Sequence, residues 1–333
     1  MSATNSQYSI LLNSISNLLE ASKKRVASTV NYEIVKAYWS VGNYIVEFEQ
    51  TGNEKALYGS ELLKNLSRDL SMNLGRGFSR SNLNYMRAFY IAYPNSETLS
   101  HKLTWSHFIE LLKIDDANAR AFYEKQCEYE NWSVRELKRN KKSGLFHRIA
   151  VSKNKDEVLK LSKEGLIPNK PEDLIKNPHV FEFLGIKSNQ LHRESHLEKA
   201  LIENLQSFLL ELGKGFAFVG RQERITLNNR HFYVDLVFYH IVLKCYVLID
   251  LKLGSVEYEN LGQMKLYLGY YEKEINLESD NQPIGIILAE EKDEIMVEYA
   301  MLHDNANVLV SKYQLYLPNI EELKKKIEEV TEK

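Results

Sequence analysis

Two apolar segments lie close together near the middle of the second half of the chain: "HFYVDLVFYH", which begins at His231, and "KCYVLIDLK", which ends at Lys252. Both are rich in β-branched and aromatic residues, so they predict two strands joined by a tight turn. Yet they contain Asp235, Asp250 and Lys252. Buried charges are costly unless they are paired or bind an ion. This predicted hairpin therefore constrains both the fold and the chemistry of the chain.

The three charged residues are expected to converge. Side chains alternate between the two faces of a strand, so Asp250 and Lys252 share one face. If the turn is centred between Val242 and Leu243, Asp235 lies directly opposite Asp250. If the register slips, the two carboxylates become diagonal neighbours about 7–8 Å apart at Cα, which is still within reach of one shared ion.

Two adjacent carboxylates repel each other, and a divalent cation removes that repulsion. Carboxylate oxygens suit Mg²⁺, which keeps several waters and leaves positions open for phosphate oxygens. A lysine beside such a site can orient or deprotonate an attacking water, or stabilise the transition state. The pattern favours metal-assisted phosphodiester hydrolysis. A structural salt bridge between Lys252 and either aspartate is the alternative.

The chain of 333 residues divides into two textures. Residues 1–150 show apolar residues at three- and four-residue spacing, which predicts an all-α domain. Residues 151–180 contain three of the six prolines and predict a linker. Residues 181–333 predict a separate α/β domain of α-β-β-β-α-β order. Within it we expect one helix over residues 195–213 and another over residues 290–302.

The composition excludes several classes of protein. The net charge of −2 gives no global attraction to nucleic acid, so any such attraction must be local. Two distant cysteines, Cys127 and Cys245, argue against disulfides and a cysteine-ligated zinc site. The chain has no run of about 18 apolar residues, and its start lacks the pattern of a signal peptide. We expect a cytoplasmic protein that does not span a membrane.

The helical half contains a candidate helix-turn-helix in "DLSMNLGRGFSRSNLNYMRAFY". The second helix would present its first residues to the major groove, and Arg76, Arg80 and Arg87 could contact phosphates or bases. Lysine and arginine also outnumber acidic residues strongly between Asn131 and Lys155. A local basic patch is typical of a polyanion site, although solvated charge on a helical bundle looks the same.

The charged hairpin and its flanking segments resemble a known family. An aspartate followed about fifteen residues later by D-x-K resembles the PD-(D/E)XK nuclease core. The segments "FYVDLVFYH", "CYVLIDLKLG" and "NLGQMKLYLGYY" are similar to the C-terminal domain of YhcG-like bacterial proteins. The segments "GFSRSNLNYMRAFY" and "NWSVRELKRN" resemble the N-terminal domain of the same family, so the resemblance covers nearly the whole chain.

The resemblance implies roles for individual residues. Asp235 and Asp250 would bind the metal, Lys252 would be the catalytic lysine, and Glu198 would be the carboxylate from the preceding helix. The family more often has Glu at the position of Asp250. Glu198 also has a local alternative, because Ser195 and Glu198 have the spacing of a capping box.

Three further residues are expected to contact nucleic acid. Gln263 and Tyr267 are one helical turn apart and resemble a Q-x-x-x-Y helix that faces the site in related nucleases. The alternative is that Tyr267 only packs on the sheet. Gln222, at a strand near the same site, is the third. His231 and His240 flank the strand of Asp235 and are expected at the surface, without a role.

The predicted function is a metal-dependent endonuclease that hydrolyses DNA, in repair, recombination or defence against foreign DNA. The cofactor is expected to be Mg²⁺, with Mn²⁺ as a substitute. A homodimer is expected by analogy with nucleases of this fold, and a repair or defence protein is a further candidate partner. Two alternatives stay open: a non-cleaving nucleic-acid-binding or interaction protein on a nuclease fold, and an RNA-directed nuclease.

Overall fold

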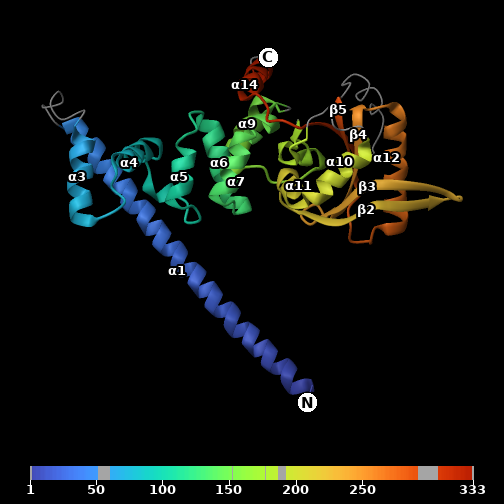
Figure 1. Cartoon of the computed structure of the whole chain (residues 1–333), viewed down its shortest axis with the longest axis horizontal. Helices are drawn as coiled ribbons and strands as arrows, with labels where there is room; N and C mark the ends of the chain where they lie inside the picture. The colour runs from blue at the N-terminus through green and yellow to red at the C-terminus, as the bar shows by residue number, and fades with distance from the viewer. Residues whose placement is uncertain are drawn as a thin grey trace. The chain divides into compact units, whose positions relative to one another are not determined.

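The computed structural model describes residues 2–51, 61–151, 153–176, 178–186, 193–291 and 307–331. The chain forms two compact units, Met1–Lys138 and Arg139–Lys333. The first unit is helical and the second contains a mixed sheet with helices on both faces (Figure 1). This confirms the expected combination of an all-α region and an α/β region.

The first unit is built from helices with short connections. They are α1 (Ser2–Thr51), α3 (Leu62–Leu74), α4 (Arg80–Ala92), α5 (Trp105–Leu111) and α6 (Ala117–Glu130), with the 3₁₀ turn η1 (Ser96–Thr98). α7 (Val134–Lys142) crosses the boundary between the units.

Local sequence signals explain where these helices begin and how they pack. Ser79 caps α4 by accepting a hydrogen bond from the Asn82 backbone N–H. Ser133 and Glu136 form the capping box expected at the start of α7. Leu83 and Met86 of α4 are fully buried and pack against α1. Gly42 of α1 permits this close approach, because a Cβ there would lie 2.1 Å from the Met86 carbonyl oxygen.

The second unit begins with short helical elements and one short strand. They are α8 (Leu145–Ala150), α9 (Lys155–Glu164), η2 (Pro171–Leu174), β1 (His179–Val180) and η3 (Glu182–Leu184). The expected linker at 151–180 therefore includes α9, and β1 extends the sheet. Pro171 does not mark an open linker here, because it occupies the first turn of η2, where its missing N–H costs nothing.

The sheet and its covering helices make up the rest of the second unit. They are α10 (Glu194–Glu203), α11 (Leu205–Leu212), β2 (Phe216–Leu227), β3 (Arg230–His240), β4 (Cys245–Ser255), α12 (Tyr258–Tyr270), the π turn η5 (Tyr271–Ile275), β5 (Ile284–Glu291), β6 (Val308–Gln314) and α14 (Ile320–Thr331). The strand order is β1-β6-β5-β4-β3-β2, with β2, β3 and β4 antiparallel and β4, β5, β6 and β1 parallel.

Each face of the sheet has its own apolar core. One core joins Leu197 and Leu201 of α10 and Phe208 of α11 to the strands. The other joins Met264 and Tyr267 of α12 to the opposite face. The helix expected over residues 195–213 is instead two helices, which meet at Asn204. The helix expected over residues 290–302 falls mostly outside the described residues.

A buried ionic cluster ties α8 to α11 and β1. The Arg148 guanidinium is fully buried and lies 2.6 Å from the Glu211 carboxylate, which is also fully buried. Arg148 donates to the carbonyl oxygens of Ser143 and Pro178 as well. The Val180 backbone N–H donates to the same Glu211 oxygen at 3.0 Å. Arg148 is therefore part of the core, not of the surface basic patch that its sequence neighbours suggested.

Two further observations bear on the sequence expectations. His240 is fully buried, not at the surface, and its ring lies within hydrogen-bonding distance of the Lys214 carbonyl oxygen. In the part of the chain that the structure describes, no helix combines the length and the apolar character needed to cross a membrane.

Candidate active site

Three neighbouring strands bring Gln222, Asp235 and Asp250 into one row. β3 and β4 pair Leu236 with Ile249, so the same register places Asp235 opposite Asp250. The turn between these strands is centred between Val242 and Leu243, as expected. β2 and β3 pair Arg221 with Leu236, which places Gln222 opposite Asp235.

Asp235 lies where the pairing of β3 with β4 ends. One carboxylate oxygen accepts a hydrogen bond from the Leu251 backbone N–H at 2.8 Å, and the other accepts from the Gln222 amide at 3.0 Å. A side chain thus takes the place of a backbone partner at this point of the ladder. This holds the Asp235 carboxylate beside β4 and next to Asp250.

Asp250 is buried and surrounded by opposing influences. Burial is the largest cause that raises its pKa, to about 7, and the nearby Asp235 carboxylate raises it further. Lys252 acts against both, since its ammonium lies 2.9 Å from Asp250. The pair therefore forms the salt bridge that was the alternative to a metal site, but the bridge does not remove the repulsion between the two aspartates.

Lys252 is held as an ammonium. Burial lowers the pKa of Lys252, but the carboxylates of Asp250, Glu194 and Asp235 together raise it by more, so the net shift is upward. Its ammonium also lies 3.3 Å from the Glu194 carboxylate. A lysine with a raised pKa donates hydrogen bonds at neutral pH and is a poor proton acceptor.

Glu198 points to the aspartates, not to its own helix terminus. α10 begins at Glu194 and has Arg193 as N-cap without a side-chain capping bond, so the capping box of Ser195 and Glu198 is not formed. The Gln222 amide donates to the Glu198 carboxylate at 2.7 Å. Burial raises the pKa of Glu198, the Gln222 hydrogen bond lowers it, and Asp235 raises it.

Gln222 connects the two carboxylates. Its amide nitrogen donates both to Glu198 and to Asp235. Its backbone is left-handed, with φ of 49°, a conformation that L-residues rarely adopt and that often marks functional sites. The prediction placed Gln222 near the site, but sequence could not show this bridging contact or the unusual backbone.

Sequence reasoning missed Glu194. Its carboxylate contacts Lys252 from the first turn of α10. Glu194 precedes Glu198 by four residues, so both lie on one face of the helix. This spacing was the signal that could have identified it.

Gln263 and Tyr267 are joined on α12. The Gln263 amide donates to the Tyr267 hydroxyl, which donates to the Tyr233 carbonyl oxygen at 2.9 Å. Tyr267 is fully buried in the core on that face of the sheet, so it packs as the alternative expected. Any contact of this pair with nucleic acid would therefore be made by Gln263, which is partly exposed.

The candidate arginines of the first unit differ in availability. Arg76 and Arg80 are exposed, in the turn after α3 and at the first residue of α4. Arg87 forms an ion pair with Glu49 of α1 at 2.7 Å. A short turn connects α3 to α4, and α4 packs on α1 through its apolar face.

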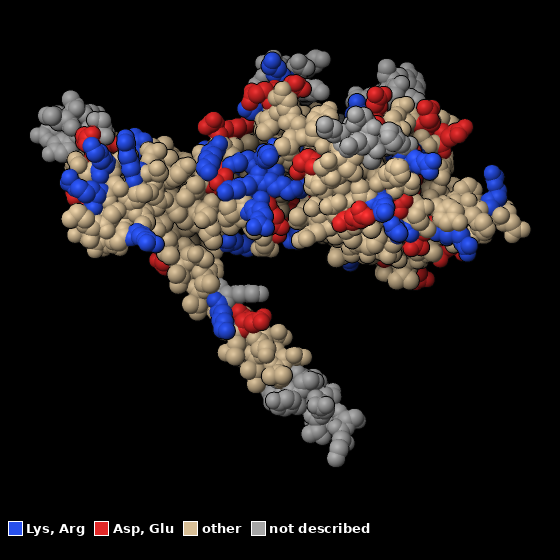
Figure 2. Space-filling view, viewed as in Figure 1, with Lys and Arg blue, Asp and Glu red and all other residues tan. Residues whose placement is uncertain are grey.

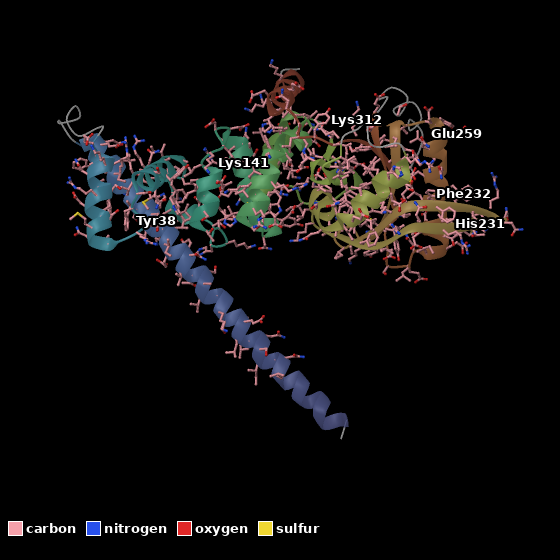
Figure 3. The ribbon with its side chains drawn as sticks, viewed as in Figure 1. Tyr38, Lys141, His231, Phe232, Glu259 and Lys312 are labelled. Carbon is pink, nitrogen blue, oxygen red and sulfur yellow. The ribbon has the colours of Figure 1, made fainter. Side chains whose placement is uncertain are left out.

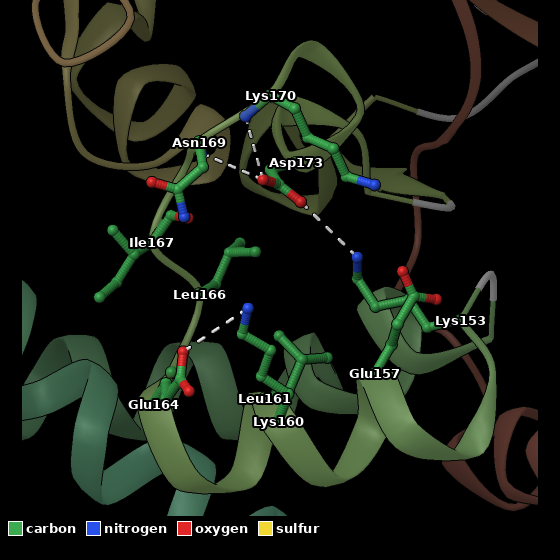
Figure 4. Close-up of a pocket in the computed structure, with 11 residues that line it drawn as sticks. Lys153, Glu157, Lys160, Leu161, Glu164, Leu166, Ile167, Asn169, Lys170 and Asp173 are labelled. Carbon is green, nitrogen blue, oxygen red and sulfur yellow. Dashed lines mark hydrogen bonds and ion pairs between the residues drawn. The ribbon is translucent and has the colours of Figure 1, made fainter.

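A pocket of about 280 Å³ lies elsewhere in the second unit, along α9 and the segment that follows it (Figure 4). Two lysines of its lining are paired with carboxylates: Lys153 lies 3.7 Å from Asp173, and Lys160 lies 3.9 Å from Glu164. None of the predicted site residues lines this pocket. The pocket is therefore separate from the predicted site.

The donor set at the aspartates fits a hard divalent cation. Within the described residues, no group of three or more His, Cys, Asp or Glu side chains is arranged as a ready metal centre. Asp235 and Asp250 nevertheless provide two adjacent carboxylates whose mutual repulsion raises the pKa of Asp250. Glu198 adds a third carboxylate through the shared Gln222 amide. A cation would relieve this repulsion.

Two family models together match most of the chain. The YhcG PDDEXK nuclease domain matches residues 172–328, and the DUF1016 N-terminal domain matches residues 14–148. The Escherichia coli (strain K12) protein named "Putative nuclease YhcG" is 35% identical, and the match covers 95% of this chain and 92% of that protein.

Two solved structures are more distant. A repair endonuclease from Pyrococcus abyssi is 20% identical with a TM-score of 0.27, over 38% of this chain and 49% of that one. The EndoMS-dsDNA2 complex is 17% identical with a TM-score of 0.26, over 38% of this chain and 45% of that one. This chain thus spans about half the length of these two proteins.

Proposed function

We propose that this chain, which belongs to the YhcG family of PDDEXK nucleases, is a metal-dependent endonuclease. Its active site, formed by Asp235, Asp250 and Lys252, would cleave DNA. The observation that carries the proposal is the meeting of two carboxylates beside a lysine that remains an ammonium. A purely structural ion pair would need only one of the two aspartates.

The residues that would hold the cation are Asp235 and Asp250, with Glu198 as a third carboxylate. Mg²⁺ is the expected ion, and Mn²⁺ should substitute for it. When bound, the cation would polarise a phosphate oxygen and lower the pKa of a bound water. The binding of a cation requires the ionised carboxylates, so it should be coupled to release of the Asp250 proton.

The side chains of this protein have distinct tasks in the proposed reaction. Lys252 donates a hydrogen bond to a phosphate oxygen and stabilises the negative charge that develops as water attacks phosphorus in line. Its raised pKa favours this role over that of a proton acceptor. Glu194 and Asp250 fix the direction of the ammonium. Gln222 keeps Glu198 and Asp235 in position.

DNA is the substrate that we propose. Exposed lysine and arginine side chains support a substrate that is a polyanion. Arg76 and Arg80 are available in the first unit, while Arg87 is occupied by Glu49. Basic side chains also gather over α7 (Figure 2), where Arg135, Lys138 and Lys142 are exposed. Phosphate contacts of this kind supply affinity without sequence preference. We place the activity in repair, recombination or defence, with a partner protein from such a system.

We also propose that two copies associate through α1. Leu12, Leu19 and Val26 are seven residues apart and are 51%, 56% and 64% exposed, with Ile15 between them at 48%. Seven-residue spacing is typical of a coiled-coil seam. The test is light scattering after gel filtration: a dimer is expected for the wild type and a monomer for Leu19→Glu with Val26→Glu. A monomeric wild type contradicts this pairing.

Cleavage assays test the nuclease proposal. Duplex, branched and single-stranded DNA and matched RNAs are incubated with Mg²⁺ or with EDTA. We expect DNA cleavage that EDTA abolishes and that Asp250→Asn eliminates. Asn should be tolerated in the fold, because it has the size of the carboxyl and because burial already raises the pKa of Asp250 to about 7. Glu203→Gln, at an exposed carboxylate of α10, is the matched control that retains activity.

Three outcomes would contradict it. Cleavage of RNA alone favours the RNA-directed alternative. Binding of DNA without cleavage under any metal condition favours the non-cleaving alternative. Full activity of Asp250→Asn places the reaction at another site.

A further inference from the structure

β2 and β3 continue as a two-stranded arm after β4 has ended its pairing with β3. We define the arm as residues 223–234. β3 pairs with β4 only from Leu236 onward, whereas the pairing of β2 with β3 continues to Leu227 opposite Arg230 (Figure 1). Asn228 and Asn229, both with positive φ, close the tip as a tight hairpin turn. The arm therefore starts immediately beyond the row of Gln222 and Asp235.

The arm has an inner and an outer face. Ile225 and Val234 are buried in the core with α12, and Phe232 and Leu227 pack partly against it. The alternating residues form the outer face, where Arg224 pairs with Tyr233 and Thr226 pairs with His231 across the strands. Arg224, Thr226 and His231 are exposed, and Tyr233 is 45% exposed. Figure 3 labels His231 and Phe232 on neighbouring positions of this arm.

The chemistry of the outer face suits nucleic acid. An exposed tyrosine beside an arginine combines stacking with phosphate or base contact. Arg224 is exposed, so its charge is available to a ligand. The Thr226 hydroxyl and the His231 Nδ1 atom lie 3.0 Å apart, which gives the far end of the face further polar groups. The major groove of B-DNA is wide enough for a two-stranded β arm.

The arm is attached to the candidate active site at its base. The Tyr233 carbonyl oxygen accepts a hydrogen bond from the Tyr267 hydroxyl at 2.9 Å, and Gln263 donates to that hydroxyl. Gln222 and Asp235 are the next residues along the two strands. A duplex bound along the outer face would therefore be led to the carboxylates.

We propose that the outer face of the arm binds duplex DNA and positions it for cleavage, with Arg224 and Tyr233 as the principal contacts. This inference rests on the proposed nuclease function and identifies the surface of the second unit that binds the substrate. It also assigns His231, for which no role was expected, to the substrate surface.

The test combines Arg224→Gln with Tyr233→Ser, both on the exposed face, so that the buried contacts of the arm are kept. Lys244→Gln is the matched control, since Lys244 is an exposed cation in the β3–β4 turn at the other end of β3. Binding to a short DNA duplex is measured in the Asp250→Asn background at several salt concentrations, and cleavage is measured in the active background.

We expect the double variant to bind DNA at least about tenfold more weakly, and the dependence of binding on salt to decrease by about one phosphate contact. KM should rise while kcat is largely kept, and the circular dichroism spectrum and Tm should match those of the control. The Lys244→Gln control should bind like the parent protein.

Two results overturn the inference while leaving the proposed function in place. One is cleavage by the wild type together with unchanged binding by the double variant. The other is tighter binding to the matched duplex RNA, whose deep and narrow major groove does not admit such an arm. A wild type that neither binds nor cleaves DNA overturns the proposed function and this inference together.

Discussion

The ion pair between Lys252 and Asp250 keeps the lysine charged but does not keep the pKa of the aspartate low. The lysine lowers the pKa of Asp250, but burial and Asp235 still raise that pKa to about 7. The Asp250 carboxyl can therefore accept a proton near neutral pH even beside the ammonium. The ion pair therefore matters more for the charges of the site than for the free energy of unfolding.

The first prediction concerns Lys252→Met. Without the ammonium, the pKa of Asp250 should rise further, and the carboxyl should be protonated at pH 7, so no unpaired charge is buried. We expect cleavage to fall by about 10²-fold or more, because loss of one hydrogen-bond donor that stabilises developing negative charge typically costs that much. The Tm should change little. Cleavage rates and thermal unfolding check both parts, and undiminished cleavage would contradict the role of Lys252.

The buried His179 ring should make the stability of the fold depend on pH. Burial lowers the pKa of His179 to about 3, although Glu211 raises it; Lys176 and Arg148 lower it as well. The unfolded chain takes up a proton near pH 6.5, and the folded chain does not until much lower pH. The free energy of unfolding should therefore decrease as pH falls below about 6.5, by about 1.4 kcal/mol per pH unit.

The matched variant is His179→Gln, which keeps a polar side chain but cannot be protonated. Between pH 7.5 and pH 5, the wild type should lose about 2 kcal/mol more stability than the variant. Urea unfolding at both pH values measures this difference. Titration of Glu211 lies below this window, because its pKa is lowered to about 2. Parallel pH profiles for the two proteins would show that His179 is protonated in the folded state.

Single residues were predictable only where a periodic pattern fixes them. Strand alternation and the length of the turn were enough to place Asp235 opposite Asp250 and Lys252 beside it. The contact of Arg148 with Glu211 was not predictable, because 63 residues separate them and nothing local marks either one. Gln222 was found near the site, but its left-handed backbone depends on the tertiary fold.

At the scale of elements, boundaries depend on contacts that sequence does not show. The apolar pattern over residues 195–213 continues through Asn204, yet two helices meet there and cover one face of the sheet. The Ser195–Glu198 spacing suggested the start of a helix, but α10 begins one residue earlier and Glu198 is used by Gln222. Capping signals held where the side chains had no competing partner, as at Ser133.

α8 provides the prediction at this scale. Arg148→Met should leave the fully buried Glu211 carboxylate without its closest counter-charge. Loss of one partner of a buried ion pair typically costs about 3–5 kcal/mol. We expect a decrease of this size in the free energy of unfolding, measured with urea at pH 7.

The double variant Arg148→Met with Glu211→Gln separates charge from packing. Gln can still accept the hydrogen bond from the Val180 backbone N–H, but it carries no charge. Most of the lost stability should return. If the double variant is as unstable as Arg148→Met alone, the packing of the arginine stem, and not the charge pair, holds α8 in place.

For the whole molecule, the family boundary and the structural boundary differ. The DUF1016 N-terminal domain match ends at residue 148, and the nuclease domain match begins at residue 172. The compact second unit begins earlier, at Arg139. The composition change at the prolines of residues 151–180 marks short capped elements, and these elements contribute β1 to the sheet. A change in composition along a sequence therefore need not coincide with the boundary between two folded units.

This difference leads to a prediction about fragments. A fragment of residues 139–333 retains α8, Arg148 and β1, so it should unfold cooperatively and keep the site around Asp250. A fragment of residues 172–333 follows the family boundary but lacks Arg148, so Glu211 would be buried without its closest counter-charge. It also lacks α8, against which α14 packs. We expect the shorter fragment to be aggregated or to lack a cooperative transition.

Circular dichroism melts and gel filtration compare the two fragments. Glu211→Gln in the shorter fragment should restore part of the unfolding transition if the unpaired charge is the cause. A shorter fragment as stable as the longer one would show that the nuclease unit folds without the end of the helical domain.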